Sequence, residues 1–160
     1  MKIAYADPPY MGQAKKHYQH EDSYAGEVNQ GALIQTLTTD FPDGWALSCS
    51  TPSLRHLLPH CPDDIRIAAW VKPFAIFKPN VNPAYAWEPV LFRGGRKRSR
   101  KESTVRDWVS ANITLKKGLV GAKPEAFCTW LFDLMGLQDG DEFVDIFPGT
   151  GIVTAVWESR

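Results

Sequence analysis

The stretch Ile3-Ala4-Tyr5-Ala6-Asp7-Pro8-Pro9-Tyr10 predicts a short buried strand that ends at a carboxylate, two prolines and an aromatic ring. Pro9 restricts Pro8 to an extended backbone, and neither proline has an N–H group, so the loop offers carbonyls without competing donors. A carboxylate and a carbonyl could accept both N–H hydrogens of a planar amino group, while Tyr10 stacks on its ring. The structural alternative is a strand followed by a proline turn, with Asp7 as a cap.

A second motif lies at the other end of the chain, in Glu142-Phe143-Val144-Asp145-Ile146-Phe147-Pro148-Gly149-Thr150-Gly151. It predicts a buried strand, a glycine turn and a helix start, and the glycines would let a ligand approach the backbone closely. A dinucleotide site is not expected, because a third glycine and an acid about 20 residues further on are missing. A phosphate-binding P-loop is excluded, since no Gly-Lys-Ser/Thr follows. An ordinary strand-to-helix turn is the alternative.

Together the two motifs resemble those of amino-methyltransferases that use S-adenosylmethionine (SAM), with an Asp-Pro-Pro-Tyr catalytic motif and a Phe-x-Gly-x-Gly cofactor motif. The catalytic motif comes first, as in the circularly permuted β class of DNA adenine-N6 or cytosine-N4 methyltransferases. The middle of the chain is similar, in the order of its motifs, to RNA N6-adenosine methyltransferases and their bacterial and phage relatives. These motifs are Trp70-Val71-Lys72-Pro73, Trp87-Glu88-Pro89-Val90-Leu91-Phe92 and Gly121-Ala122-Lys123-Pro124.

The resemblance implies methyl transfer from SAM to the exocyclic amino group of a nucleobase, with adenine N6 in DNA expected and cytosine N4 or RNA adenine as alternatives. It implies no metal. The family's Ser-x-Lys-Pro lysine maps onto Lys123, but Gly121 stands where the serine would be. The implied catalytic residues are Asp7, Pro8, Pro9 and Tyr10. The implied cofactor-binding residues are Ala6, Asp7, Lys123, Asp145, Phe147, Pro148, Gly149, Thr150 and Gly151.

The sequence also departs from the family. Typical β-class enzymes continue into a second strand whose terminal acid holds the cofactor ribose, whereas only Ile152 to Arg160 follow the glycine turn here. A separate target-recognition domain is not visible, so sequence specificity should be short or borrowed. Two other classes therefore stay open. One is a non-catalytic nucleic-acid-binding protein on the same scaffold, and the other is a methyltransferase of a protein glutamine amide, although those enzymes usually carry Asn in place of Asp7.

Length and composition agree with one compact domain over residues 1–160, because 44% of the side chains are hydrophobic. Eighteen basic and eighteen acidic residues cancel, so any site for a polyanion must be local. Cys49, Cys61 and Cys128 lack paired zinc spacing, and Pro59 interrupts the candidate cluster around His56 and His60, so no metal site is expected. Reduced thiols and the lack of a signal peptide or membrane span indicate a cytoplasmic protein. A homodimer is left open.

Alternating strand and helix signals predict an α/β fold. The resemblance narrows this to a single-domain Rossmann-like methyltransferase sheet with helices on both faces, circularly permuted and shortened. We expect strands near 2–6, 45–50, 66–72, 89–93 and 142–147, and helices near 30–40, 51–58, 104–111 and 124–136. The residues assigned to the core are Trp45, Trp70, Trp108, Trp130, Phe127, Leu131, Leu134 and Met135, and Trp87 is left open.

Irregular stretches at 10–29 and 74–87 and a charged one at 93–103 are where a DNA partner, or alternatively RNA, should bind. Segment 11–24 follows the catalytic motif and would form a lid. It carries cations and rings suited to phosphates and bases, namely Lys15, Lys16, His17, Tyr18, His20 and Tyr24. The second candidate is a basic run made of Arg93, Arg96, Lys97, Arg98, Arg100 and Lys101, for which a solvated loop is the alternative.

Overall fold

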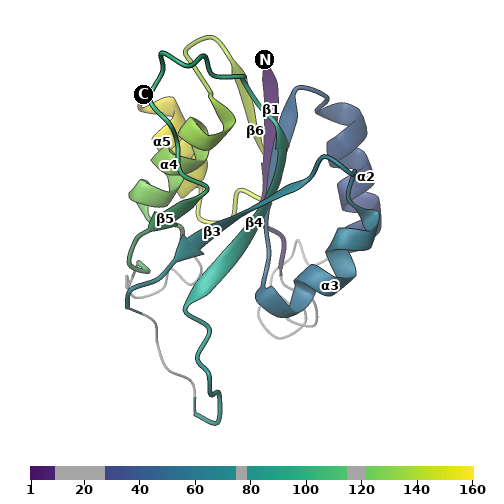
Figure 1. Cartoon of the computed structure of the whole chain (residues 1–160), viewed down its shortest axis with the longest axis vertical. Coiled ribbons are helices and arrows are strands. Elements are labelled where there is room, and N and C mark those ends of the chain that lie inside the picture. Colours follow the sequence, from purple (N-terminus) through teal and green to yellow (C-terminus); the bar gives the residue numbers. More distant parts are fainter. Residues whose placement is uncertain (10–27, 75–78, 115–121) are drawn as a thin grey trace.

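Six strands form one mixed sheet in the order β5-β3-β4-β2-β1-β6 (Figure 1). The computed structural model describes residues 1–9, 28–74, 79–114 and 122–160. All described strands run parallel except β4, which is antiparallel to both of its neighbours. The strands are β1 Lys2–Ala6, β2 Gly44–Ser48, β3 Arg66–Val71, β4 Trp87–Gly94, β5 Trp108–Ser110 and β6 Glu142–Asp145.

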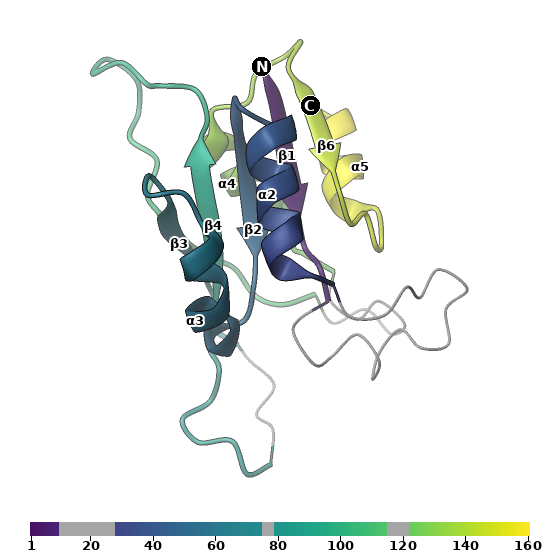
Figure 2. The same ribbon diagram turned by 90° about the vertical axis from the view of Figure 1, so that its right-hand side faces the viewer.

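Helices cover both faces of this sheet. Figures 1 and 2 show α2 and α3 on one face and α4 and α5 on the other. The helices are α2 Gln30–Asp40, α3 Leu54–Leu57, α4 Glu125–Met135 and α5 Ile152–Glu158, and the 3-10 turns η1 Thr51–Ser53 and η2 Leu58–His60 flank α3. The prediction of an α/β sheet with helices on both faces is therefore confirmed. The circular permutation stays a prediction.

Strand β1 shows how the sequence builds the two-sided core. Ile3 and Tyr5 pack in the cluster that α4 and α5 cover, whereas Ala4 and Ala6 pack in the cluster under α2. All four residues are at most 1% exposed. Successive side chains of a strand point to opposite faces, so a strand buried on both faces reads as an uninterrupted apolar run. By the same alternation Asp7, the next odd position, belongs to the α4 side.

The two long helices begin and end where the sequence predicts, to within one residue. Asn29 caps α2, since its side-chain oxygen accepts a hydrogen bond from the Ala32 N–H at 3.0 Å. Pro124 precedes α4, and Gly136 ends it in the left-handed conformation with φ of 65°. A side chain at Gly136 would also lie 2.7 Å from the Cβ of Arg96. Local capping chemistry therefore sets both boundaries.

The predicted helix over 104–111 is wrong, because Trp108–Ser110 forms the edge strand β5 beside β3. Trp and Val fit a pleated, half-buried edge, and pairing with Ala69 to Val71 of β3 is a tertiary effect. Trp108 is 43% exposed, so its assignment to the core is also wrong. Trp45, Trp70 and Trp130 are buried as predicted, and Trp87 starts β4 with 40% exposure.

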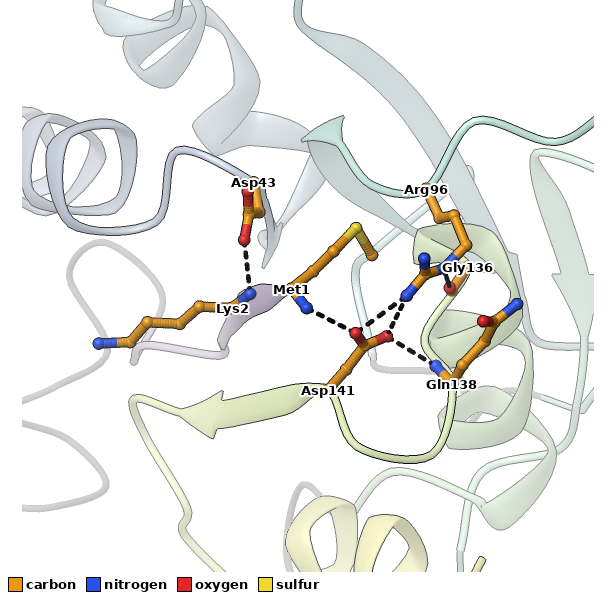
Figure 3. Close-up of polar contacts among 7 residues, drawn as sticks. All are labelled: Met1, Lys2, Asp43, Arg96, Gly136, Gln138 and Asp141. Carbon is orange, nitrogen blue, oxygen red and sulfur yellow. Dashed lines mark hydrogen bonds and ion pairs between the residues drawn. The ribbon is translucent and has the colours of Figure 1, made fainter.

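A polar cluster ties the amino ends of β1 and β6 to the segment after β4 (Figure 3). The Asp141 side chain, 5% exposed, accepts from the Met1 amino group at 2.6 Å and the Gln138 N–H at 2.8 Å. Arg96 Nη2 donates to both Asp141 oxygens, at 2.9 and 2.8 Å, and Arg96 Nε donates to the Gly136 carbonyl at 3.1 Å. The Met1 amino group, the Gln138 N–H and Arg96 hold the pKa of Asp141 well below its ordinary value.

We expect Arg96→Met to lower the free energy of unfolding by roughly 1–3 kcal/mol, because it leaves the buried Asp141 without its guanidinium. Lys97→Met is the matched control, since Lys97 is exposed. A carboxylate with a depressed pKa stabilises the fold above its unfolded pKa, and this stability is lost as the pH falls through its folded pKa. Urea titrations from neutral to acid pH should show the difference between variant and parent shrinking. Equal stability of Arg96→Met and Lys97→Met at neutral pH would contradict the expectation.

Candidate active site

The two sequence motifs lie side by side at the carboxyl ends of the neighbouring strands β1 and β6. β1 and β6 are parallel neighbours in which Tyr5 pairs with Asp145, and the Ile146 N–H donates to the Tyr5 carbonyl at 2.8 Å. Asp7 therefore follows β1 directly beside the start of the glycine turn that follows β6. Ligands of open α/β sheets bind in this position, outside the carboxyl ends of parallel strands. Pro8 is buried and Pro9 half-buried, while Tyr10 lies outside the described residues.

Asp7 is held by the ammonium group of Lys123. The Lys123 Nζ lies 2.7 Å from Asp7 Oδ2, and the Lys123 side chain is 5% exposed against 22% for Asp7. Burial raises the pKa of Asp7, although Lys123 lowers it in part. Burial lowers the pKa of Lys123, but Asp7 and Glu88 outweigh that effect and raise it. The Lys123 ammonium therefore offsets part of the effect of burial on the Asp7 carboxylate.

Two charged residues that sequence reasoning did not select complete this arrangement. Lys123 Nζ also lies 3.6 Å from Glu88 Oε2, and Lys72 Nζ donates to Glu88 Oε1. Lys72, Glu88, Lys123 and Asp7 thus form a row of alternating charge, which we call the charge row. A signal was present in the sequence, since Lys72 and Glu88 fall inside the two Trp-containing motifs, where Trp70 of β3 pairs with Glu88 of β4.

Aromatic rings line the charge row. Lys123 Nζ lies 5.5 Å from the centroid of the Trp70 ring and 5.9 Å from that of Phe127, and Lys72 Nζ lies 4.6 Å from the Trp70 ring. The Tyr5 hydroxyl and the Ser48 Oγ are hydrogen-bonded at 2.8 Å, and burial raises the pKa of Tyr5 well above its ordinary value. Ring faces attract cations, so this wall fixes both ammonium groups without competing for Asp7.

Asp145, at the end of β6, is a carboxylate with capacity for a ligand. Its Oδ2 accepts from Thr154 Oγ1 at 3.3 Å, while its Oδ1 is buried and has no hydrogen-bond partner among the described residues. Burial raises the pKa of Asp145, and the Thr154 hydroxyl and the Phe147 backbone N–H lower it in part. A buried carboxylate oxygen normally has a donor, so the amino end of a ligand fits here.

The glycine turn supplies an open approach next to Asp145. Gly149 and Gly151 have φ of 48° and 72°, a conformation that favours glycine. A Cβ at Gly149 would meet only the Phe147 carbonyl, at 3.9 Å, and one at Gly151 would meet no described atom within 4 Å. Phe147 packs against the cluster under α2, whereas Pro148 and Thr150 are exposed. A cofactor that needs close backbone contact fits this turn.

The predicted basic run lies at the end of the sheet away from Asp7, near the amino end of β1. Gly94, at the end of β4, pairs with Gly44 of β2, which in turn pairs with Ile3 near the amino end of β1. Arg93 forms an ion pair with Asp64 at 2.9 Å, and Arg98 Nη2 donates to the Asp133 carbonyl at 2.7 Å. Together with Arg96, these arginines stabilise the fold locally. Lys97, Arg100 and Lys101 are exposed, and a phosphate-binding role for the run stays a prediction.

Other predictions concern the lid, metals and membranes. Lys15, Lys16, His17, Tyr18, His20 and Tyr24 lie outside the described residues. Within the described ranges, no group of three or more His, Cys, Asp and Glu side chains could hold a metal ion. Cys49, Cys61 and Cys128 are free thiols. Over the same ranges, no helix is long and apolar enough to cross a membrane.

No family model matches the sequence, and no curated protein matches it. Two structures of M1.HpyAVI are among the solved structures that share its fold. The crystal structure of the M1.HpyAVI-SAM complex superposes with a TM-score of 0.62 at 15% identity, covering 99% of this chain and 78% of M1.HpyAVI. The crystal structure of M1.HpyAVI superposes with the same TM-score at 14% identity, covering 99% of this chain and 76% of the other. The chain thus has the fold of M1.HpyAVI.

Proposed function

We propose that this protein transfers a methyl group from SAM to the exocyclic amino group of a nucleobase, and that adenine N6 in DNA is its substrate. The observation that carries the proposal is the position of Asp7, paired with Lys123 and directly beside the glycine turn of β6. The fold supports it as well, since M1.HpyAVI, which was crystallised in complex with SAM, has the same architecture.

The chemistry follows from the weakness of an aromatic amine as a nucleophile, because its lone pair is delocalised into the ring. Asp7 Oδ1 and the Pro8 carbonyl would accept the two N–H hydrogens and draw the lone pair out of the ring. SAM supplies an electrophilic methyl group on a sulfonium. As the N–C bond forms, the S–C bond of the sulfonium would break and S-adenosylhomocysteine would leave as a neutral thioether. The nitrogen would become positive and release one proton to Asp7, whose pKa is raised by burial.

The cofactor side of the site would use the residues around the glycine turn. Asp145 Oδ1 would accept from the amino group of SAM, which satisfies a buried oxygen that has no donor among the described residues. Gly149 and Gly151 would admit the ligand to the backbone, since a Cβ at either would lie in open space. Ala6 is buried beneath this edge.

Calorimetry with SAM, followed by incubation with SAM carrying a labelled methyl group, tests the proposal. Arms with single-stranded DNA, duplex DNA and RNA identify the accepted polymer. We expect SAM to bind and DNA to become labelled. Absence of SAM binding would favour a nucleic-acid-binding protein on the same scaffold, and labelling of RNA alone would overturn the choice of DNA.

Exposed aromatic rings lie at the same end of the sheet as Asp7. They are better candidates for base contacts than the basic run, which lies at the other end. Phe74, Tyr85 and Trp87 are 55%, 58% and 40% exposed, and they flank the segment that joins β3 to β4. β2 and β3 are both antiparallel to β4, and β1 is parallel to β2, so β3 runs in the same direction as β1. β3 therefore ends at the same end of the sheet as β1. Rings that lie in water at the edge of a site are suited to stacking on unpaired bases.

We expect Phe74→Ala with Tyr85→Ala to weaken binding of single-stranded DNA by about 1–3 kcal/mol per stacked base and to leave the salt dependence unchanged. The comparison variant replaces Lys97, Arg100 and Lys101 by Gln and keeps Arg93 and Arg96 in their ion pairs. If the basic run binds phosphates, this variant should flatten the slope of log affinity against log salt by about 0.7 per lost contact. Unchanged affinity in the aromatic variant would remove the rings from the interface.

A further inference from the structure

Lys123 makes its shortest polar contact with the proposed catalytic carboxylate, at 2.7 Å, although the family resemblance gives it a role at the cofactor. Three further side chains surround the Lys123 ammonium. Glu88 lies behind it at 3.6 Å, and the rings of Trp70 and Phe127 flank it. Pro124 restricts the Lys123 backbone to an extended conformation just before α4 begins. With the side chain 5% exposed, Lys123 has little freedom to leave Asp7.

We propose that Lys123 is a positioning residue for Asp7: its ammonium occupies Oδ2, keeps the carboxylate ionised, and leaves Oδ1 as the acceptor for the target amine. Glu88 and Lys72 complete the charge row and hold Lys123 in place. This inference rests on the proposed function and assigns roles to Glu88 of β4 and to Lys72, which directly follows β3. The catalytic and cofactor motifs include neither residue.

The Lys123 ammonium compensates in part for the burial of the Asp7 carboxylate. Asp7 is buried enough that its pKa is raised, and removing the adjacent cation would raise it further. A protonated Asp7 would donate rather than accept at one oxygen and could not take up the proton released by the amine. Among the described residues, the charged and titratable groups that interact electrostatically with Asp7 include Lys123, Glu88, Lys72, Asp145, Tyr5 and Cys49, and Lys123 and Lys72 are the cations of this set.

The test compares Lys123→Met with Lys72→Met. Both changes remove one ammonium that contacts Glu88 and lies over Trp70, but only Lys123 touches Asp7. The first readout is a carbon-13 NMR titration of the Asp7 carboxyl in the protein without SAM or nucleic acid, with Asp7→Asn used to assign the signal. We expect the pKa of Asp7 to rise in Lys123→Met and to move much less in Lys72→Met, while Lys123→Arg keeps it near the parent value.

The second readout is methyl transfer as a function of pH. In Lys123→Met we expect kcat to fall at neutral pH and to recover by about tenfold per pH unit as Asp7 ionises, until the pH passes its new pKa. The SAM dissociation constant should stay within about threefold of the parent, a difference of less than about 0.7 kcal/mol. A large loss of SAM affinity with a normal pH profile would instead make Lys123 a cofactor ligand.

The outcomes separate this inference from the proposed function. An unmoved Asp7 titration in Lys123→Met overturns the inference even if the parent transfers methyl groups. A raised Asp7 pKa in a protein that labels no nucleic acid keeps the positioning role and removes the proposed function. If Lys123→Met does not fold, Lys123→Gln offers Glu88 a polar partner without a charge, and the same titration decides.

Discussion

Replacing Asp7 by Asn should reduce methyl transfer by about 10²–10⁴-fold, the range typical of a lost general base. Asn keeps the shape of the side chain and can accept one hydrogen bond, but it carries no charge to draw out the amine or to take its proton. The proposed chemistry depends on both properties. Turnover of labelled SAM with DNA is the measurement, and the loss should appear in kcat rather than in the affinity for SAM.

The matched control is Asp64→Asn, which removes a carboxylate that is 59% exposed and paired with Arg93. Turnover of that variant should equal the parent's. Thermal unfolding of Asp7→Asn must also be recorded, because among the described residues Lys123 then keeps Glu88 alone as a carboxylate partner, at 3.6 Å. Retention by Asp7→Asn of more than about a tenth of the parent turnover, a barrier change below about 1.4 kcal/mol, would remove Asp7 from the chemistry.

The second large effect is expected at the glycine turn, where Gly151→Ala should abolish most of the stabilisation that SAM gives to the fold. Gly151 has φ of 72°, and its Cβ would point into space that no described atom occupies within 4 Å. A methyl group there would meet a ligand that approaches the backbone, and relief of the backbone strain would also reshape the turn. Thermal-shift titration with SAM measures the effect.

Gly140→Ala separates ligand contact from strain. Gly140 has φ of 85° and equally open surroundings, but it lies before β6, at the edge away from Asp7. Both variants should therefore lose a similar amount of intrinsic stability, about 1–2 kcal/mol, while only Gly151→Ala loses the response to SAM. Equal SAM-induced shifts in the two variants and the parent would mean that the cofactor site lies elsewhere.

Elements governed by local chemistry could be predicted from the sequence. The apolar run Ile3 to Ala6 fixes β1, Asn29 and Gly136 fix helix boundaries, and the glycines after β6 fix the turn. Asp7 was selected because it follows such a strand, and Asp145 because the family resemblance implies a cofactor role for it. That Asp7 and Asp145 lie at the ends of two adjacent strands depends on the order of the sheet, which only the structure reveals.

Features that depend on tertiary neighbours could not be predicted from the sequence. β5 is a strand because β3 lies beside it, and Trp108 is exposed because that strand is an edge. Arg96 appeared to be part of a free basic run, since nothing local indicates that Asp141, 45 residues away, faces it. The charge row could not be predicted for the same reason, because Glu88 comes close to Lys123 only when β4 lies antiparallel between β2 and β3.

Nucleoside analysis of DNA after incubation with methyl-labelled SAM tests the central claim most directly. The parent protein and Asp7→Asn are incubated with the same DNA, which is then digested to nucleosides and resolved by mass spectrometry. We predict labelled N6-methyldeoxyadenosine from the parent and little or none from Asp7→Asn. Label on cytosine N4 would make cytosine, not adenine, the substrate of the same reaction. SAM binding without label on any DNA or RNA nucleoside would contradict the account.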